Sequence, residues 1–357
     1  MPRCPGYMSA WRLTTYRDRL TTGLAPYAAW RTACSAGRQM SPMTDSAWRF
    51  RCTARSATLL GIYLLNLVGI VFTLGIYSFW AKVRVRRYLF SQLEVAGERL
   101  EYHGLGGELL RGALKAALVF GLPLAIVRTL PRLVDVGVAG AVVAWILSSL
   151  FIALFLPVAR VGARRYRLSR TSWRAIRFSF VGQPGPYVWI FLRGWCLTIL
   201  TLGVYYPVFA VKSHAYMVAH STFGSAPFDF DGDGRDLVLD WVYALLLTLP
   251  TVGFVWFWFG ARRSAYLWAH TTLAGARFGF AVTGAEVMRL WLGNAALLLV
   301  SLGVAYPWTV VRNALFTCAR LSLDGSLDVT VIRAAPTAAS ATGEGILGLL
   351  EADLDWA

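Results

Sequence analysis

Charged side chains are scarce in this sequence, and acidic ones are the scarcest. Only 15% of the 357 residues are charged, whereas an average soluble protein has about 25%. The chain has 19 acidic residues against 35 Lys and Arg, and the only lysines are Lys82, Lys115 and Lys212. Because 57% of the residues are hydrophobic and the mean hydropathy is +0.52, a disordered chain and a large soluble enzyme are excluded. This composition is typical of a membrane protein.

Cysteine pairs and catalytic motifs are also missing. The five cysteines are scattered without a CxxC pair, so their spacing predicts neither a disulfide framework nor a zinc site. There is no Walker loop, GxSxG, HExxH, kinase motif set or paired-carboxylate site. We therefore assign no catalytic, cofactor-binding or metal-binding residue. Whether the protein is an enzyme stays open, and the sequence favours the answer no.

Long apolar runs fill most of the chain from Ala57 onward. A bilayer core about 30 Å thick needs about 20 helical residues. Six runs serve as candidate spans, near residues 57–80, 113–130, 137–158, 187–209, 237–259 and 288–309. The fold class expected is an all-α polytopic membrane protein with about six transmembrane helices.

Three segments are expected along the chain. Residues 1–46 are rich in Arg, Ala and Thr and are interpreted as an N-terminal extension, either disordered or the product of a mis-annotated start before Met40 or Met43. A short amphipathic segment is the alternative. Residues 47–333 form the repeated multi-pass membrane domain, and residues 334–357 form a C-terminal tail.

The strongest pattern is an internal repeat of about fifty residues. An aromatic residue marks each copy: Tyr88, Tyr166, Tyr216, Tyr266 and Phe316. Thr-Leu-Gly or a near copy precedes four of them, with its glycine thirteen residues before the aromatic residue: Gly75, Gly203, Gly253 and Gly303. A basic residue stands four residues before the same aromatic residues: Arg84, Lys212, Arg262 and Arg312. Each unit thus predicts an apolar helix that ends at Thr-Leu-Gly, followed by a basic amphipathic helix.

A short strand is predicted after each basic helix, because apolar residues alternate there. These residues are Leu100 and Tyr102, Phe178 and Phe180, Phe228 and Phe230, and Phe278 and Phe280. Phe50 and Cys52 share the register upstream, and Leu327 and Val329 close the series one residue out of step. Unpaired strand edges cannot lie in lipid, so we expect these segments to pair with one another outside the hydrocarbon. Each apolar helix either spans alone or forms a hairpin with its basic helix.

The stretch from Thr73 to Tyr88, TLGIYSFWAKVRVRRY, continues to Glu101-Tyr-His-Gly104 and resembles the YjgN-like family of bacterial inner-membrane proteins. Leu202-Gly-Val-Tyr-Tyr-Pro207 and Ser301-Leu-Gly-Val-Ala-Tyr-Pro307 fit the same pattern. The resemblance covers roughly residues 48–330. It implies a multi-pass protein of the bacterial inner (plasma) membrane. The family is a domain of unknown function, so no catalytic residue follows from it.

Several residues are candidates for a site. Asn66 and Asn294 lie within apolar runs, where they either line a functional path or hydrogen-bond to a neighbouring helix. The basic register is expected to anchor its helices to anionic lipid headgroups, and no nucleic-acid partner is expected. The turn glycines either allow close packing, break a helix or cap its C-terminus.

Two apparent metal motifs are interpreted without a metal. Asp229-Phe-Asp231-Gly-Asp233-Gly234 resembles the start of a calcium loop, but Asp240 replaces its final glutamate, so we interpret it as a solvated strand end. His220 and His270 share one register and are interpreted as interfacial polar residues.

Two functions remain open. The first is a transporter or channel with its path between repeats. The alternative is a non-transporting envelope scaffold or lipid-interacting membrane protein. A water-filled cavity lined by Asn66 or Asn294 would favour transport, and a solid bundle packed by lipid would favour the alternative. The sequence does not indicate an oligomeric state.

Overall fold

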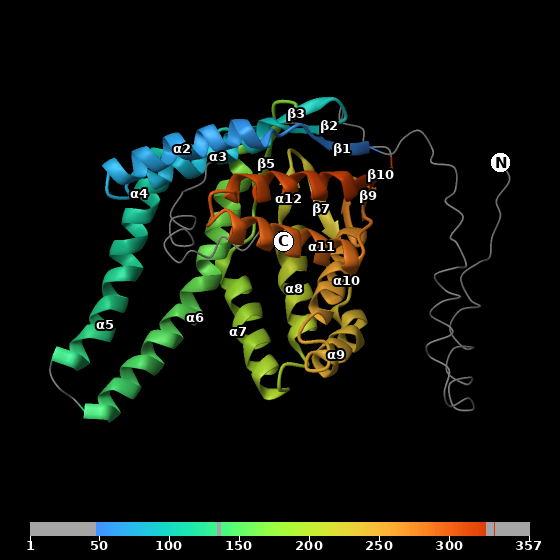
Figure 1. Cartoon of the computed structure of the whole chain (residues 1–357). Helices are drawn as coiled ribbons and strands as arrows, with labels where there is room; N and C mark the ends of the chain where they lie inside the picture. The colour runs from blue at the N-terminus through green and yellow to red at the C-terminus, as the bar shows by residue number, and fades with distance from the viewer. Residues whose placement is uncertain (1–47, 134–136, 326–331, 333–357) are drawn as a thin grey trace, which may run out of the picture. The chain divides into compact units, whose positions relative to one another are not determined.

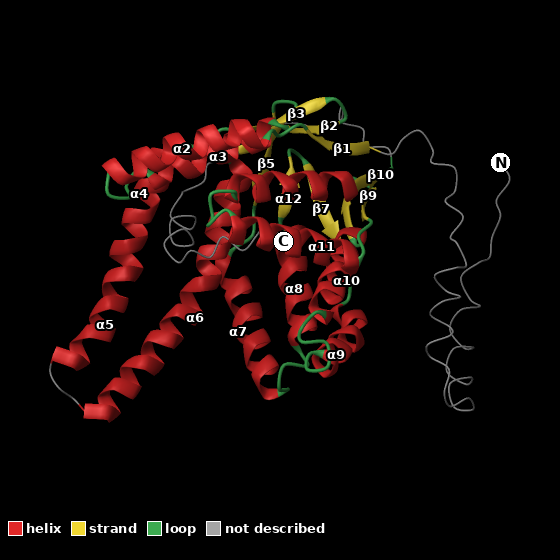
Figure 2. Cartoon of the chain, viewed as in Figure 1, coloured by secondary structure: helices red, strands yellow, loops and turns green. Residues whose placement is uncertain are grey.

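A ring of ten short strands organises the described part of this computed structural model, which comprises residues 48–133, 137–325 and 332. The antiparallel strands close into a barrel in the order β1-β10-β9-β8-β7-β6-β5-β4-β3-β2. Five longer strands are β1 (Trp48–Cys52), β3 (Glu98–Tyr102), β5 (Ile176–Phe180), β7 (Ala226–Phe230) and β9 (Ala276–Phe280). Five shorter strands are β2 (Leu93–Val95), β4 (Thr171–Trp173), β6 (Ser221–Phe223), β8 (Thr271–Leu273) and β10 (Leu321–Asp324). Figure 2 shows the strands gathered together, with the helices extending from them.

A helical segment follows every longer strand. Four of these segments are hairpins: α2 (Ser56–Phe72) with α3 (Ser78–Ser91), α7 (Pro184–Leu200) with α8 (Tyr206–Ala219), α9 (Val238–Leu247) with α10 (Val255–Ala269), and α11 (Gly284–Val300) with α12 (Tyr306–Arg320). A short turn η2 (Gly234–Leu237) precedes α9. The remaining segment consists of α4 (Gly106–Ala116), a π-helical turn η1 (Ala117–Gly121), α5 (Leu122–Leu133) and α6 (Gly137–Ser169). Figure 1 shows α5 and α6 running away from the strands toward their shared end.

All five helical segments leave from the same end of the barrel. The last residue of each longer strand pairs with the first residue of the next shorter strand, as Phe180 does with Ser221 and Phe230 with Thr271. The tight β-turns between strands consequently lie at the opposite end.

Apolar side chains from every strand fill the barrel. The middle residues of the longer strands form an inner ring: Phe50, Leu100, Phe178, Phe228 and Phe278. Neighbouring phenylalanines of this ring have centroids 6.4 Å apart. Phe223 and Trp173 pack beside it and are almost fully buried. The barrel is therefore a packed core rather than a pore, as is usual for small barrels.

The prediction of an all-α protein with about six transmembrane helices is wrong. Among the described residues, two helical segments are long and apolar enough to cross a membrane, Gly106–Leu130 and Gly137–Ser169. The other predicted spans run through a hairpin turn, so that 57–80 combines nearly all of α2 with the start of α3. The turn residues are themselves apolar and conceal the reversal. With 17 residues, α2 is about 25 Å long and falls short of a bilayer core of about 30 Å.

The predicted strands are confirmed, but the prediction that they pair with one another is wrong. Each longer strand pairs with shorter strands that the sequence analysis did not predict. Tyr102, Phe180, Phe230 and Phe280 all lie in strands and pair across to the next strand. Phe50 and Cys52 belong to β1, which pairs with both β2 and β10 and so closes the ring. Leu327, Val329 and the predicted segments 1–46 and 334–357 lie outside the described residues, as do Met40 and Met43.

Replacing Phe223 by alanine should lower the free energy of unfolding by about 3–5 kcal/mol, because a fully buried ring is removed from the barrel core. Phe254→Ala is the matched control, since the Phe254 side chain is exposed and its loss should cost less than about 1 kcal/mol. Denaturant unfolding of both variants in detergent measures the difference. Equal losses would contradict a packed barrel.

Candidate functional site

The four hairpins share one turn geometry. In each turn a Thr or Ser is followed by two residues with positive φ: Leu74 and Gly75, Leu202 and Gly203, Val252 and Gly253, Leu302 and Gly303. This Thr or Ser directly caps the first helix in three hairpins, whereas α9 ends earlier, at Leu247. The glycine N–H donates to the carbonyl five residues earlier, as Gly203 does to Thr198 at 2.7 Å. This hydrogen bond is the one that closes helix C-termini with a left-handed residue.

The hydroxyl that ends the first helix also connects it to the second. Thr201 Oγ1 donates to the carbonyl of Leu197 at 2.7 Å and accepts from the N–H of Tyr205 at 3.0 Å. Thr73 makes the same two hydrogen bonds, to Gly69 and from Tyr77. One side chain therefore satisfies backbone groups of both helices, which lets the chain reverse within four residues.

Gly75, Gly203 and Gly303 are surrounded by open space. A Cβ atom added to any of them would meet nothing within 4 Å, whereas φ lies between 87° and 93°. At Gly253, φ is 82° and the nearest atom, on Trp256, is 3.9 Å away. These glycines therefore serve the backbone conformation of the turn and not a close approach of two helices.

Large apolar side chains project from these turns. The exposed fraction is 95% for Leu74, 92% for Leu202, 84% for Val252 and 93% for Leu302. Six flanking residues are also exposed: Phe72, Ile76, Leu200, Leu249, Val300 and Val304. We call these six and the four turn residues the apolar tips. Exposed apolar clusters of this kind mark contact with a partner or a membrane.

Asn66 and Asn294 lie on buried positions of the first helices α2 and α11. Asn66 Oδ1 accepts a hydrogen bond from Arg84 Nη1 at 3.3 Å, and Asn294 Nδ2 donates to Asn313 Oδ1 at 2.7 Å. Each contact joins the two helices of one hairpin. The structure thus brings one predicted asparagine together with one predicted basic residue.

The four basic residues of the repeat lie on exposed faces of the second helices. Arg262 Nε donates to Asp240 Oδ2 at 2.6 Å, and Lys212 Nζ lies 3.4 Å from the Tyr205 hydroxyl. Arg312 packs over Gly293. Each basic residue follows its turn glycine by nine positions, which is up to about 13 Å along a helix. Every hairpin therefore has an apolar tip and a positive charge at the same spacing.

The repeated tyrosine clasps the two ends of its helical segment, a role that the sequence analysis missed. Tyr88 Oη accepts from the N–H of Arg55 at 2.9 Å and donates to its carbonyl at 3.1 Å. Tyr266 makes both contacts with Asp233 at 2.8 Å, and Tyr216 donates to the carbonyl of Gln183 at 2.7 Å. The partner is a backbone group 33 residues upstream each time, so no side-chain pattern in the sequence indicated the contact.

Phe316 has no hydroxyl for such a clasp, and a capping box takes over. The Thr283 side chain caps the first turn of α11, while Glu286 Oε2 accepts from the N–H of Thr283 at 3.1 Å. Arg320, at the end of α12, donates to Glu286 Oε1 at 2.6 Å. The two ends of the fifth segment are therefore joined through an ion pair instead.

His214 of α8 lies near the barrel, together with the charges of Arg164 and Arg263. His214 contacts the Phe230 ring at the end of β7, with centroids 5.4 Å apart. Burial, together with the nearby charges of Arg164 and Arg263, lowers the pKa of His214 to about 4. His214 is therefore neutral at pH 7. The sequence analysis did not single out this group, because its members come from three different helices.

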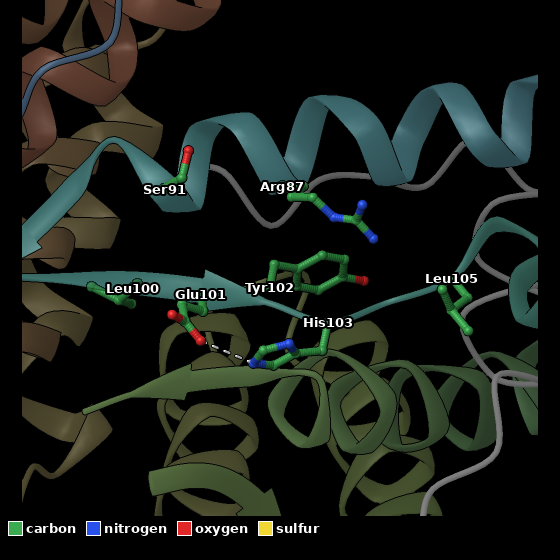
Figure 3. A pocket seen from close by; sticks show the side chains of 7 residues that line it. All are labelled: Arg87, Ser91, Leu100, Glu101, Tyr102, His103 and Leu105. Carbon is green, nitrogen blue, oxygen red and sulfur yellow. Dashed lines mark ion pairs between the residues drawn. The ribbon is translucent and has the colours of Figure 1, made fainter. Parts of the chain in front are cut away.

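An open cavity of about 440 Å³ lies between α3 and β3 (Figure 3). Its lining residues are Arg87, Ser91, Leu100, Glu101, Tyr102, His103 and Leu105. His103 Nε2 is 2.8 Å from Ser172 Oγ and 3.3 Å from Glu101 Oε2. Both neighbours use the same ring nitrogen, and Ser172 is buried, so the three cannot act as a nucleophile, base and orienting acid. Neither Asn66 nor Asn294 is among the residues that line this cavity.

The carboxylates of the calcium-like stretch each have a separate protein donor. Asp231 accepts from Arg277 at 2.8 Å and lies 2.7 Å from His270 Nδ1, while Asp236 accepts from Tyr266 at 2.7 Å. These donors occupy oxygens of both carboxylates. Within the described ranges, no group of three or more His, Cys, Asp or Glu residues could hold a metal ion.

Gly203→Ala should cost about 1–3 kcal/mol of stability, because alanine is strained at a φ of 93°. Gly185→Ala is the matched control: the site also has open space, but its φ is ordinary, so the effect should be neutral or stabilising by up to about 1 kcal/mol. Thermal unfolding in detergent compares the two. A Gly203 variant as stable as the Gly185 variant would show that the turn does not require glycine.

His214→Gln should flatten the pH dependence of stability between pH 6.5 and pH 4. The folded pKa of His214 is about 4, below its unfolded value of about 6.5, so the unfolded chain binds more protons in this window. The stability that the neutral His214 contributes is present above pH 6.5. Up to about 3 kcal/mol of it is lost as the pH falls toward 4. Denaturant midpoints are measured at pH 7 and pH 4.5 for the wild-type protein and the variant. The carboxylates titrate in both proteins, so the difference between the two profiles reports His214 alone. Parallel pH profiles would contradict the burial of a neutral His214.

Comparison with known proteins identifies the family. Residues 47–253 and 241–349 match the family described as "Bacterial protein of unknown function (DUF898)". The chain is 31% identical over 129 residues to the inner membrane protein YjgN of Escherichia coli K12, covering 36% of this chain and 30% of that protein. It is 29% identical over 119 residues to inner membrane protein YjgN of Salmonella typhimurium LT2, covering 33% and 28%.

These alignments span about 30% of the length of the curated relatives. No solved structure matches the chain. The family match extends over most of the sequence from residue 47 onward. The resemblance to YjgN-like proteins is thereby confirmed, and the chain belongs to this bacterial family of unknown function.

Proposed function

We propose that this protein is a bacterial inner-membrane protein that acts through contact with lipid. In this proposal the apolar tips enter one leaflet, the two long helical segments cross the bilayer, and the barrel stays outside the hydrocarbon. The observation that carries the proposal is the exposed leucine at positive φ in three hairpin turns, with valine in the fourth. The left-handed conformation costs at least about 1 kcal/mol. Transfer of a leucine side chain from water to lipid contributes about 1.5–3 kcal/mol and offsets that cost.

The two long helical segments support a multi-pass arrangement. Gly106–Leu130 has 25 residues and Gly137–Ser169 has 33, enough for about 37 Å and 50 Å of helix. Only 17% of the most apolar window in each is buried, which is unlike the core helix of a soluble protein. The curated relatives are named as inner membrane proteins, which supports the same location.

The spacing of charge and apolar surface supports insertion to the depth of one leaflet. Half of a hydrocarbon core about 30 Å thick is about 15 Å, close to the distance of about 13 Å between each turn glycine and its basic residue. In a hairpin that stands upright with its tip at the midplane, the basic residue (Arg84, Lys212, Arg262 or Arg312) would then lie level with the headgroups. Anionic lipid would contribute about 1 kcal/mol for each free charge. Arg262, which is paired with Asp240, should contribute least.

A lipid-contact role has more support than a transport role. The barrel interior is filled by side chains, and the two asparagines are hydrogen-bonded within their own hairpins. A solute path between hairpins stays a prediction. A scaffold function for other envelope proteins is compatible with the same lipid contacts.

Labels at two positions of one hairpin test the proposal. Single cysteines replace Leu202 at the tip and Val181 next to the barrel, both exposed, in a chain whose native cysteines are serine. After fluorophore labelling and reconstitution into liposomes, nitroxides deep in the acyl chains should quench the label at 202. Aqueous iodide should quench the label at 181. Quenching of both labels by iodide alone would overturn insertion of the tips.

A further inference from the structure

The barrel has a seam where the two ends of the described fold meet. Each of the first four helical segments is followed by a shorter and then a longer strand. After the last hairpin comes the shorter strand β10, and β1 lies beside it in the ring, where the next longer strand would be. Phe90, two residues after Tyr88, packs against Tyr102 at the end of β3, with centroids 5.6 Å apart. The equivalent positions at the seam are Cys318, two residues after Phe316, and Cys52, at the end of β1. Two thiols thus occupy the place of two rings.

We propose that Cys52 and Cys318 form a disulfide that closes the barrel covalently. Helix α12, which carries Cys318, packs directly against β1, which carries Cys52, and the two side chains are close enough to influence each other. Both are free thiols in this structure. Cys52 packs in the apolar cluster that also contains Val311 of α12, so strand and helix hold the two thiols against each other. The sequence separates them by 266 positions, and for that reason spacing alone predicted no disulfide.

The two thiols differ in reactivity. The hydrogen bond from the Cys318 S–H lowers the pKa of Cys52 to about 6, although burial acts in the opposite direction. The same contact and burial raise the pKa of Cys318. Cys52 is also the more accessible of the two, because Cys318 is buried and Cys52 is only half-buried. Cys52 is therefore the thiolate that attacks first, since nucleophilicity and access both belong to it.

The oxidant is a low-molecular-weight disulfide such as oxidised glutathione. The Cys52 thiolate attacks one sulfur of that disulfide, forming a mixed disulfide and releasing one thiolate, which takes up a proton. Cys318 then loses its proton to solvent and attacks the Cys52 sulfur, which forms the Cys52–Cys318 bond and releases the second small thiolate. Two protein thiols are oxidised and one small disulfide is reduced to two thiols, so atoms and electrons balance.

The bond would restrain the whole fold. It links the first strand to the last helix and encloses the eight strands β2 to β9, so it removes much of the freedom of the unfolded chain. Long loops give the largest expected effect of this kind. An increase in unfolding temperature of roughly 10 °C is expected in the oxidised protein.

The test uses the full chain with Cys4, Cys34 and Cys196 replaced by serine, in detergent, treated with oxidised glutathione. Free thiols are then blocked, and proteolytic peptides are analysed by mass spectrometry without reductant. We expect a linked pair of peptides containing Cys52 and Cys318, its loss after reduction, and the rise in unfolding temperature. Two results would overturn the proposal. Either Cys52 and Cys318 are both found as separately blocked free thiols after oxidation, or Cys52 carries glutathione and no link to Cys318 forms.

A matched control separates local geometry from general thiol reactivity. The variant Cys318→Ser, with Cys52 and the exposed Cys196 retained, has the same number of thiols but places them on β1 and α7. It should give no intramolecular link and should retain a stable mixed disulfide at Cys52. Equal linking in this control would show that chain flexibility, not the seam, determines the product, and would also overturn the proposal.

Discussion

Closure of the hydrogen-bonded ring is the constraint on which the rest of this structure depends. Strands of three to five residues pair weakly, and an open sheet of such strands would leave unsatisfied edges. In the closed order every strand has two neighbours. Because adjacent strands also receive the two ends of each helical segment, the ring determines where every hairpin begins and ends. The inner ring of Phe50, Leu100, Phe178, Phe228 and Phe278 then gives this small barrel a solid interior.

The hairpins combine two demands that conflict in water and agree in lipid. Reversing the chain in four residues requires positive φ at two successive positions, for which the second is glycine and the first is leucine or valine. Asparagine or glycine would suit the first position better in an aqueous turn. The choice of an apolar residue is understandable where the turn lies in hydrocarbon, since its backbone groups are already bonded within the turn and the Thr hydroxyl is used for the same purpose.

The sequence predicted the five longer strands of this protein but not its architecture. The alternation at residues such as Phe178 and Phe180 was enough to predict strands, because period two is a local property. Ring closure was not predictable, because the partner of β1 lies at the other end of the chain and no local pattern indicates it. Hydropathy overestimated the spans for a local reason as well: Leu202 and Val204 are apolar on both sides of Gly203, so the turn does not interrupt the run. The Tyr88–Arg55 contact was hidden for a different reason, because its partner is a backbone group with no side-chain signature.

The seam also has a consequence for biosynthesis. Leu321, which begins β10, follows Cys52 by 269 positions, and a ribosome adding 5–20 residues per second needs roughly 15–50 s to cover that distance. Throughout this time β1 of the nascent chain has β2 as a partner and one open edge. An open edge is a template for pairing with other chains, so aggregation is a hazard of the growing polypeptide more than of the finished protein. Apolar tips that enter the bilayer as each hairpin is made would keep successive strands near one another, and the membrane would then serve as the assembly platform on which the last strand finds the first.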